Sequence, residues 1–173
     1  MSKNIREISA LGILTALYVG LCIVSWPLAY TPLQFRIAEA LIVLPFYNKK
    51  YSIAIILGTF IANLIGPYGI VDAVVGSFAS ALVCLIIIAL RSKFVIAPAA
   101  GIINGIIIGA MINILAGISD PAAGLATMAS VAFFVFVVVL VGVAGFTAIE
   151  KKNPAFADML RQMNFSKSVS QKV

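Results

Sequence analysis

The 173-residue sequence contains no histidine, and only 10% of its residues are charged. It therefore lacks the commonest general base and the commonest transition-metal ligand of proteins. The patterns GxxxxGK[ST], GxSxG, HExxH and CxxC are also absent. Their absence argues against a P-loop NTPase, against the hydrolases that use GxSxG or HExxH, and against redox proteins that use CxxC. The two cysteines, Cys22 and Cys84, fall inside apolar runs, which favours buried thiols over a disulfide. We expect a protein that is not an enzyme and has no cofactor of its own.

Apolar residues are abundant instead: 62% of the chain is hydrophobic and the mean hydropathy is +1.14. A soluble domain is only about half apolar, so the composition predicts a membrane protein. Trp26 and Pro27 stand where a signal peptide would need small residues, so the first apolar stretch is expected to be a retained helix. The apolar stretches are residues 8–28, 39–47, 51–66, 70–90, 94–118 and 124–149.

These stretches predict an all-α, polytopic fold, a six-transmembrane-helix bundle formed by residues 1–150. The second span is short, since a membrane helix needs about 20 residues, and a short span often borders a substrate site. Residues 151–173 are expected to form a basic cytoplasmic tail.

Basic residues support this topology. If both termini are cytoplasmic, 11 of the 12 lysines and arginines lie on inner segments, and only Arg36 lies outside. The positive-inside rule predicts this asymmetry. The basic residues lie mostly between the apolar stretches and do not form one patch with interleaved aromatic residues. We therefore expect no nucleic acid partner.

Polar residues inside the predicted spans require an explanation, because hydrocarbon disfavours them strongly. Several lie in the outer half of the predicted bundle: Gln34, Glu39, Asn63, Asp72 and Asn113. Asn104 lies deeper, toward the cytoplasm. A polar cluster near the outer face suits the capture of a small polar ligand, on which Phe35 or Tyr68 could stack.

Each of these residues also has a structural interpretation. Glu39 follows Arg36 by three residues, so the two can pair on one helix face; alternatively, Arg36 holds Glu39 toward a ligand. Asp72 can cap the fourth span, and aromatic residues can belong to an interfacial belt. Amides can bond neighbouring helices to one another, namely Asn63, Asn104 and Asn113.

Small residues recur every four positions in three spans, a pattern that lets helix backbones approach closely in lipid. The first span has Gly12, Ala16 and Gly20; the third has Ala54, Gly58, Ala62 and Gly66; the fifth has Gly101, Gly105 and Gly109. Either the stripes pack within the chain, or one of them docks onto another membrane protein.

Two segments resemble a known family. Residues 33–41 read LQFRIAEAL and resemble the QFRISEAL-type segment of the queuosine-precursor transporter family, QueT. Residues 58–64, GTFIANL, followed by GIVD at 69–72 and by Gly76-Ser77, are similar to its third and fourth spans. The likeness covers residues 8–90. In the second half, Asn104 and Asn113 stand in spans where the family would imply acidic residues.

The resemblance implies a function and partners. Members are substrate-binding S components of energy-coupling factor (ECF) importers in the plasma membrane of prokaryotes. The implied ligand is a 7-deazaguanine such as preQ1, preQ0 or queuine. The implied partners are a transmembrane coupling (T) component and two cytoplasmic ATPases, which use ATP. An AxxxA-like motif docks the S component, and Gly12 and Ala16 have that spacing here. The alternatives are an S component for another vitamin-like ligand and a stand-alone secondary transporter.

Overall fold

The computed structural model describes residues 3–29 and 34–162, which contain helices and no strand. The prediction of an all-α fold is therefore confirmed for these residues. The elements in chain order are α1 (Lys3–Val24), α2 (Trp26–Ala29), the 3-10 helix η1 (Ile37–Val43), α3 (Leu44–Tyr47), α4 (Tyr51–Ile65), α5 (Gly69–Leu90), α6 (Lys93–Leu115), α7 (Pro121–Lys152) and α8 (Pro154–Gln162).

Four helices of the described chain are long and apolar enough to cross a bilayer: α1, α5, α6 and α7. Two shorter apolar segments, Ile37–Tyr47 and α4, lie where the second and third spans were predicted. Large apolar side chains point outward, including Ile13 at 71% and Phe94 at 93% exposure. A helical bundle that exposes so much apolar surface fits lipid and does not fit water. That all six segments cross remains a prediction.

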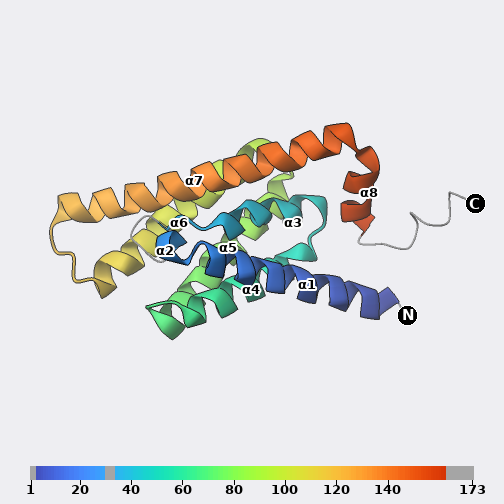
Figure 1. Cartoon of the computed structure of the whole chain (residues 1–173). Coiled ribbons are helices and arrows are strands. Elements are labelled where there is room, and N and C mark those ends of the chain that lie inside the picture. The colour runs from blue at the N-terminus through green and yellow to red at the C-terminus, as the bar shows by residue number, and fades with distance from the viewer. Residues whose placement is uncertain (1–2, 30–33, 163–173) are drawn as a thin grey trace, which may run out of the picture.

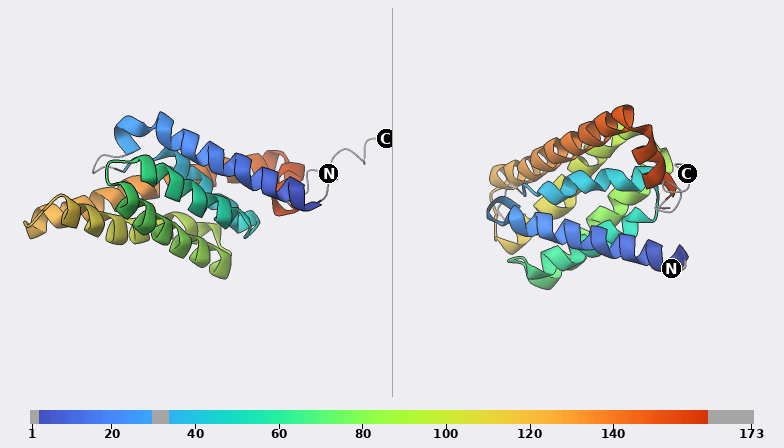
Figure 2. Two further views of the ribbon diagram at one scale, coloured as in Figure 1. Left: turned by 90° about the horizontal axis from the view of Figure 1, so that it is seen from below. Right: turned by 45° about the vertical axis from the view of Figure 1, so that its right-hand side comes forward.

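The helices form a ring in which each packs against the next: α1 on α4, α4 on α5, α5 on α6, and α6 on α7. The segment η1–α3 closes the ring between α7 and α1. In Figure 1, α7 runs along one long edge of the bundle and α1 along the opposite one, with η1 and α3 between them. The view from below in Figure 2 shows α4, α5 and α6 side by side beneath α1.

The short second segment is a 3-10 helix followed by a single α-helical turn. Because a 3-10 helix rises about 2.0 Å per residue against about 1.5 Å for an α-helix, the segment reaches further than its length suggests. Its backbone lies directly on α7, where a Cβ at Gly142 would overlap the backbone of Ala40. Gly142 therefore lets the short segment enter the bundle, and Ala38, Glu39, Ile42 and Val43 are buried there.

Small residues explain the closest helix contacts. A Cβ at Gly58 on α4 would lie 2.9 Å from the Tyr18 ring of α1, and one at Gly105 on α6 would lie 2.6 Å from the Ala132 Cβ of α7. Gly101 and Gly109 meet α7 in the same way. The stripes of the third and fifth predicted spans are thus used for packing within the chain.

Charged side chains bind the elements together at the end of the bundle where α1 begins. Glu150 accepts hydrogen bonds from Lys93, Arg161 and the Tyr47 hydroxyl. Lys50 pairs with Glu7 of α1. Helix α8 folds back at this end, as Figure 1 shows, with Ala157 and Leu160 buried. The described part of the predicted tail therefore includes a packed helix, whereas positions 163–173 lie outside the described residues. The predicted boundary at residue 150 falls inside α7.

Candidate functional site

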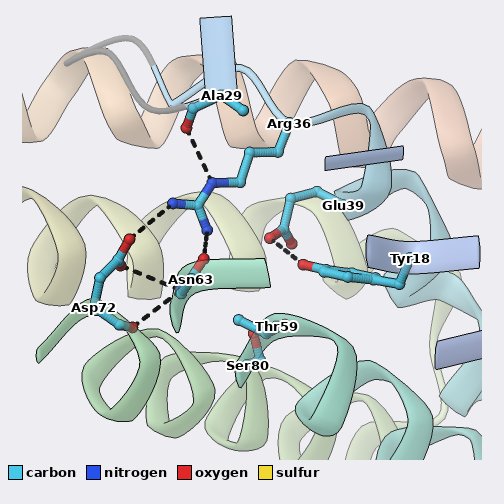
Figure 3. Close-up of polar contacts among 8 residues, drawn as sticks. All are labelled: Tyr18, Ala29, Arg36, Glu39, Thr59, Asn63, Asp72 and Ser80. Carbon is cyan, nitrogen blue, oxygen red and sulfur yellow. Dashed lines mark hydrogen bonds and ion pairs between the residues drawn. The ribbon is translucent and has the colours of Figure 1, made fainter. Parts of the chain in front are cut away.

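A buried arginine joins three parts of the chain near the centre of Figure 3. Arg36 is 5% exposed, and it is the extended residue just before η1. Its Nε donates to the Ala29 carbonyl at 3.1 Å, Nη1 to Asn63 Oδ1 at 2.6 Å, and Nη2 to Asp72 Oδ2 at 3.4 Å. The guanidinium therefore ties the end of α2 to α4 and α5, and its charge is balanced by Asp72.

Asn63 completes this arrangement from α4. Its Nδ2 donates to the carbonyl oxygen of Asp72 at 3.0 Å and to Oδ1 of the same residue at 3.2 Å. A Cβ at Gly76, one turn along α5, would overlap this amide nitrogen. We call Arg36, Asn63 and Asp72 the Arg36 clamp. Its members satisfy one another, so it braces the fold more than it offers groups to a ligand.

Glu39 lies beside the clamp but has a different set of partners. Its Oε1 accepts a hydrogen bond of 2.8 Å from the Tyr18 hydroxyl of α1, as Figure 3 shows. Its Oε2 is buried and has no hydrogen-bond partner among the described residues. A buried acceptor without a partner is costly, so this oxygen is the natural point for a ligand donor to bind.

A small enclosed cavity adjoins Glu39. Its polar lining comes from the loop residues just ahead of η1 and from η1, α4, α5 and α6: Gln34, Arg36, Glu39, Thr59, Ser80 and Asn104. Ile108, Val131 and Val135 form an apolar wall. Thr59 and Ser80 lie within hydrogen-bond distance of each other, at 3.2 Å. The free volume of about 10 Å³ has room for about one water molecule. A larger ligand therefore requires the walls to move apart.

The backbone beside the cavity is strained at one lining residue. Gln34 is 3% exposed and has a φ of 50°, a left-handed conformation that is uncommon for any residue other than glycine. Such strain persists only where the surroundings enforce it, and it gathers at binding sites.

The structure divides the residues predicted for the ligand site. Gln34, Arg36, Glu39 and Asn104 line the cavity. Asn63 and Asp72 lie behind Arg36, in the clamp. The remaining three are elsewhere: Phe35 packs edge-on against Phe134 with ring centroids 6.3 Å apart, Tyr68 precedes the first residue of α5, and Asn113 donates to the Gly124 carbonyl of α7.

Two of the structural alternatives that the sequence left open are contradicted. The ion pair of Arg36 is with Asp72 and not with Glu39, because Arg36 is extended and so does not share a helix face with Glu39. Asp72 makes no capping hydrogen bond, although it lies in the first turn of α5. Its side chain is fully buried and points to Arg36 instead.

Sequence reasoning missed Tyr18, Thr59 and Ser80. All three are buried polar residues within apolar helices, and hydroxyl groups at such positions were a usable signal. For Thr59 and Ser80 this signal was ambiguous, because a serine or threonine hydroxyl inside a helix can bond to a carbonyl of its own helix. Thr59 does so, donating to the Ile55 carbonyl.

The stripe predicted for partner docking lies on the outside of α1. Gly12 and Ala16 are exposed and Gly20 is half-buried. A Cβ added at Gly12 or at Gly20 would meet nothing within 4 Å. Unlike the stripes of α4 and α6, this one is not used for packing among the described residues.

Comparison with known proteins agrees with the architecture. The model of the family described as "QueT transporter" matches residues 8–151. A protein of Lactococcus lactis subsp. cremoris (strain MG1363), named "Queuosine precursor transporter QueT", is 37% identical over 76 residues. That match covers 43% of this chain and 44% of the relative, so it spans less than half of either protein. No solved structure matches significantly.

Proposed function

Because the chain belongs to the QueT transporter family, we propose that it is the membrane subunit that captures a queuosine precursor for import. Family membership over residues 8–151 is the observation that carries this proposal. The helices α1, α5, α6 and α7 place the chain in the plasma membrane as a multi-pass protein. A transporter family implies a role in transport rather than in catalysis.

The ligand of this proposal is a 7-deazaguanine such as preQ1, preQ0 or queuine, bound at the enlarged cavity. Of the two buried carboxylates on the described residues of this region, Asp72 is occupied by the Arg36 clamp, whereas Glu39 keeps one oxygen without a partner. The aminomethyl cation of preQ1 would meet that oxygen. The hydroxyls of Thr59 and Ser80 and the amide of Asn104 would match the donors and acceptors of the ring.

The cavity has to expand before a ring can enter it. The loop residues 34–36 just ahead of η1 are candidates for this movement, since Gln34 lines the cavity in a strained conformation and Arg36 links this part of the loop to Ala29, Asn63 and Asp72. Rearrangement of this loop on binding would relieve the strain and open the site toward the outer face.

The topology within this proposal is the one that the charges predict, with six spans and both ends in the cytoplasm. The Arg36 clamp and the cavity then lie away from the basic end of the bundle, which collects Lys49, Arg91, Lys93 and Lys151. A ligand would enter from the outside, as import requires.

Energy would come from partners: a transmembrane coupling component and two cytoplasmic ATPases of the ECF type. The exposed small-residue face of α1, formed by Gly12, Ala16 and Gly20, supports docking, because it allows a second helix to approach closely. No P-loop pattern occurs in the 173 residues.

Uptake measurements test the proposal. Cells that cannot make queuosine precursors should take up labelled preQ1 when they express the chain together with a coupling component and ATPases, and uptake should stop when ATP is depleted. Uptake without any coupling component would identify a stand-alone secondary transporter instead. No uptake and no binding of any 7-deazaguanine would overturn the assignment of the ligand.

A further inference from the structure

A second, larger hollow lies between α6 and α7, away from the cavity at Glu39. Its volume is about 510 Å³, and its walls are almost entirely apolar. Its lining includes Phe94, Ala97 and Pro98 along α6, and Phe136 and Ala144 along α7. We call this the α6–α7 groove.

The groove follows from the way in which the two helices pack. Gly101, Gly105 and Gly109 bring α6 against Met128, Ala132 and Phe136 of α7. The stripe of glycines does not extend to the start of α6. There, Ala97 and Pro98 face the groove. Phe94 is 93% exposed at its mouth. The groove therefore opens sideways, toward the lipid, where the helices are no longer held together by glycines.

Two lysines stand at one end of the groove, Lys93 and Lys151. The Lys93 ammonium pairs with Glu150 and lies 5.4 Å from the centroid of the Phe46 ring. Glu150 also pairs with Arg161, so its negative charge is already matched without Lys151, which is exposed. Basic residues outnumber acidic ones at this end of the bundle: Arg6, Lys49, Lys50, Arg91, Lys93, Lys151, Lys152 and Arg161 against Glu7, Glu150 and Asp158.

We propose that the α6–α7 groove binds an anionic phospholipid, with an acyl chain along the apolar walls and the phosphate at the Lys93 and Lys151 end. Basic pockets between membrane helices on the cytoplasmic side are the type of site that holds anionic headgroups. Lysine side chains near helix ends reach the interface, where such headgroups lie. The charge excess selects an anionic lipid over a zwitterionic one.

Charge also argues against a second copy of this chain as the occupant. Two copies related by an axis along the membrane normal would bring their lysine pairs to the same depth, where the positive charges repel. A phospholipid instead supplies a hydrocarbon chain for the apolar walls and a negative phosphate for the lysines at one end of the groove.

Native mass spectrometry of the full-length protein, titrated with phosphatidylglycerol or phosphatidylcholine, tests the proposal. We expect phosphatidylglycerol to bind more tightly, and Lys151→Gln to weaken its binding about five-fold, as one lysine near a headgroup would. Lys152→Gln is the matched control, because Lys152 is exposed but does not line the groove.

A second pair of variants tests the apolar part. Ala144→Phe should fill the groove and reduce lipid retention, and the exposure of Ala144 leaves space for the ring. Ala129→Phe makes the same change at an exposed position elsewhere on α7 and should leave retention unchanged.

Three results would overturn the proposal. The first is equal binding of the two lipids. The second is equal loss with Lys151→Gln and Lys152→Gln, which would indicate general surface charge. The third is loss of a protein partner with Ala144→Phe while lipid retention stays the same, which would make the groove a protein interface.

Discussion

At the scale of single residues, Arg36 and Asp72 form the buried ion pair of the Arg36 clamp. The two side chains are 6% and 0% exposed, and Asn63 bonds to both. A buried pair contributes little over an apolar pair of equal volume, but removal of one partner strands the other charge. The clamp therefore acts mainly by fixing where the loop, α4 and α5 meet.

Asp72→Asn should destabilise the protein strongly, because it leaves the Arg36 guanidinium buried without a counter-charge. We expect a loss of about 3 kcal/mol, measured as a fall in the thermal unfolding temperature in detergent. Asp120→Asn is the matched control. Asp120 caps α7 at an exposed position by accepting a hydrogen bond from the Ala123 amide, and asparagine caps equally well. Equal effects of the two changes would contradict the clamp.

Tyr18→Phe tests whether Glu39 is held in place for a ligand. The change removes the hydrogen bond that the Tyr18 hydroxyl donates to Glu39 Oε1 and leaves the ring that packs on Gly58. Ligand affinity should fall about three- to ten-fold, in line with the roughly 1 kcal/mol that one hydrogen bond typically contributes. Calorimetry on the purified variant measures it. Unchanged affinity would mean that Tyr18 does not position the carboxylate.

The sequence indicated which residue types would gather at the site better than it indicated their pairing. Glu39, Gln34 and Arg36 were predicted near a ligand, and they line one cavity. The partner of Arg36 was not predictable from local spacing, because its choice of Asp72 depends on how α4 and α5 pack against the loop. Asn104 was predicted as a deeper site residue than the others, and it lines the same cavity, because the short η1–α3 segment brings Glu39 into the middle of the bundle.

At the scale of helices, glycine stripes with the same spacing have different roles. The stripe of α6 packs against α7, whereas that of α1 faces outward. The spacing of the glycines alone could not distinguish these two roles. It indicates that another helix can approach closely, but it does not indicate which helix does so. The 3-10 form of the second segment was equally hidden. The segment packs against α7 at Gly142, a contact that its own sequence does not encode.

Gly12→Leu and Gly105→Leu should separate these roles. Gly105→Leu should lower the unfolding temperature of the isolated protein, because the new side chain would collide with Ala132. Gly12→Leu should leave that temperature and ligand binding intact and should reduce co-purification of the coupling component, since Gly12 has open space around it. Loss of binding with intact assembly in Gly12→Leu would show that the α1 face serves internal packing.

At the scale of the whole molecule, the ring of helices has a basic end and an opposite end with few charges. The basic end includes the start of α1 and the packed helix α8 (Figure 1). The charge pattern predicted this separation, because the positive-inside rule concerns loops and needs no tertiary information. The length of the two shorter apolar segments, Ile37–Tyr47 and α4, does not by itself determine whether they cross the bilayer fully.

Labelling of single cysteines in intact cells tests the topology. Labels at positions 49, 91 and 151 should be reachable only from the cytoplasm, and labels at 68 and 119 only from outside. The two native cysteines are buried, so they should contribute little background. An outward-facing position 91 would contradict the six-span arrangement.

The central claim is that a queuosine precursor binds in the cavity through the free oxygen of Glu39. The most direct measurement is a calorimetric titration of the purified protein and of its Glu39→Gln variant with preQ1. The account predicts saturable binding to the native protein and at least a ten-fold weaker affinity in the variant, equivalent to about 1.4 kcal/mol, because a charge-assisted hydrogen bond would be lost. Equal affinity in the two proteins, with both folded, would contradict it.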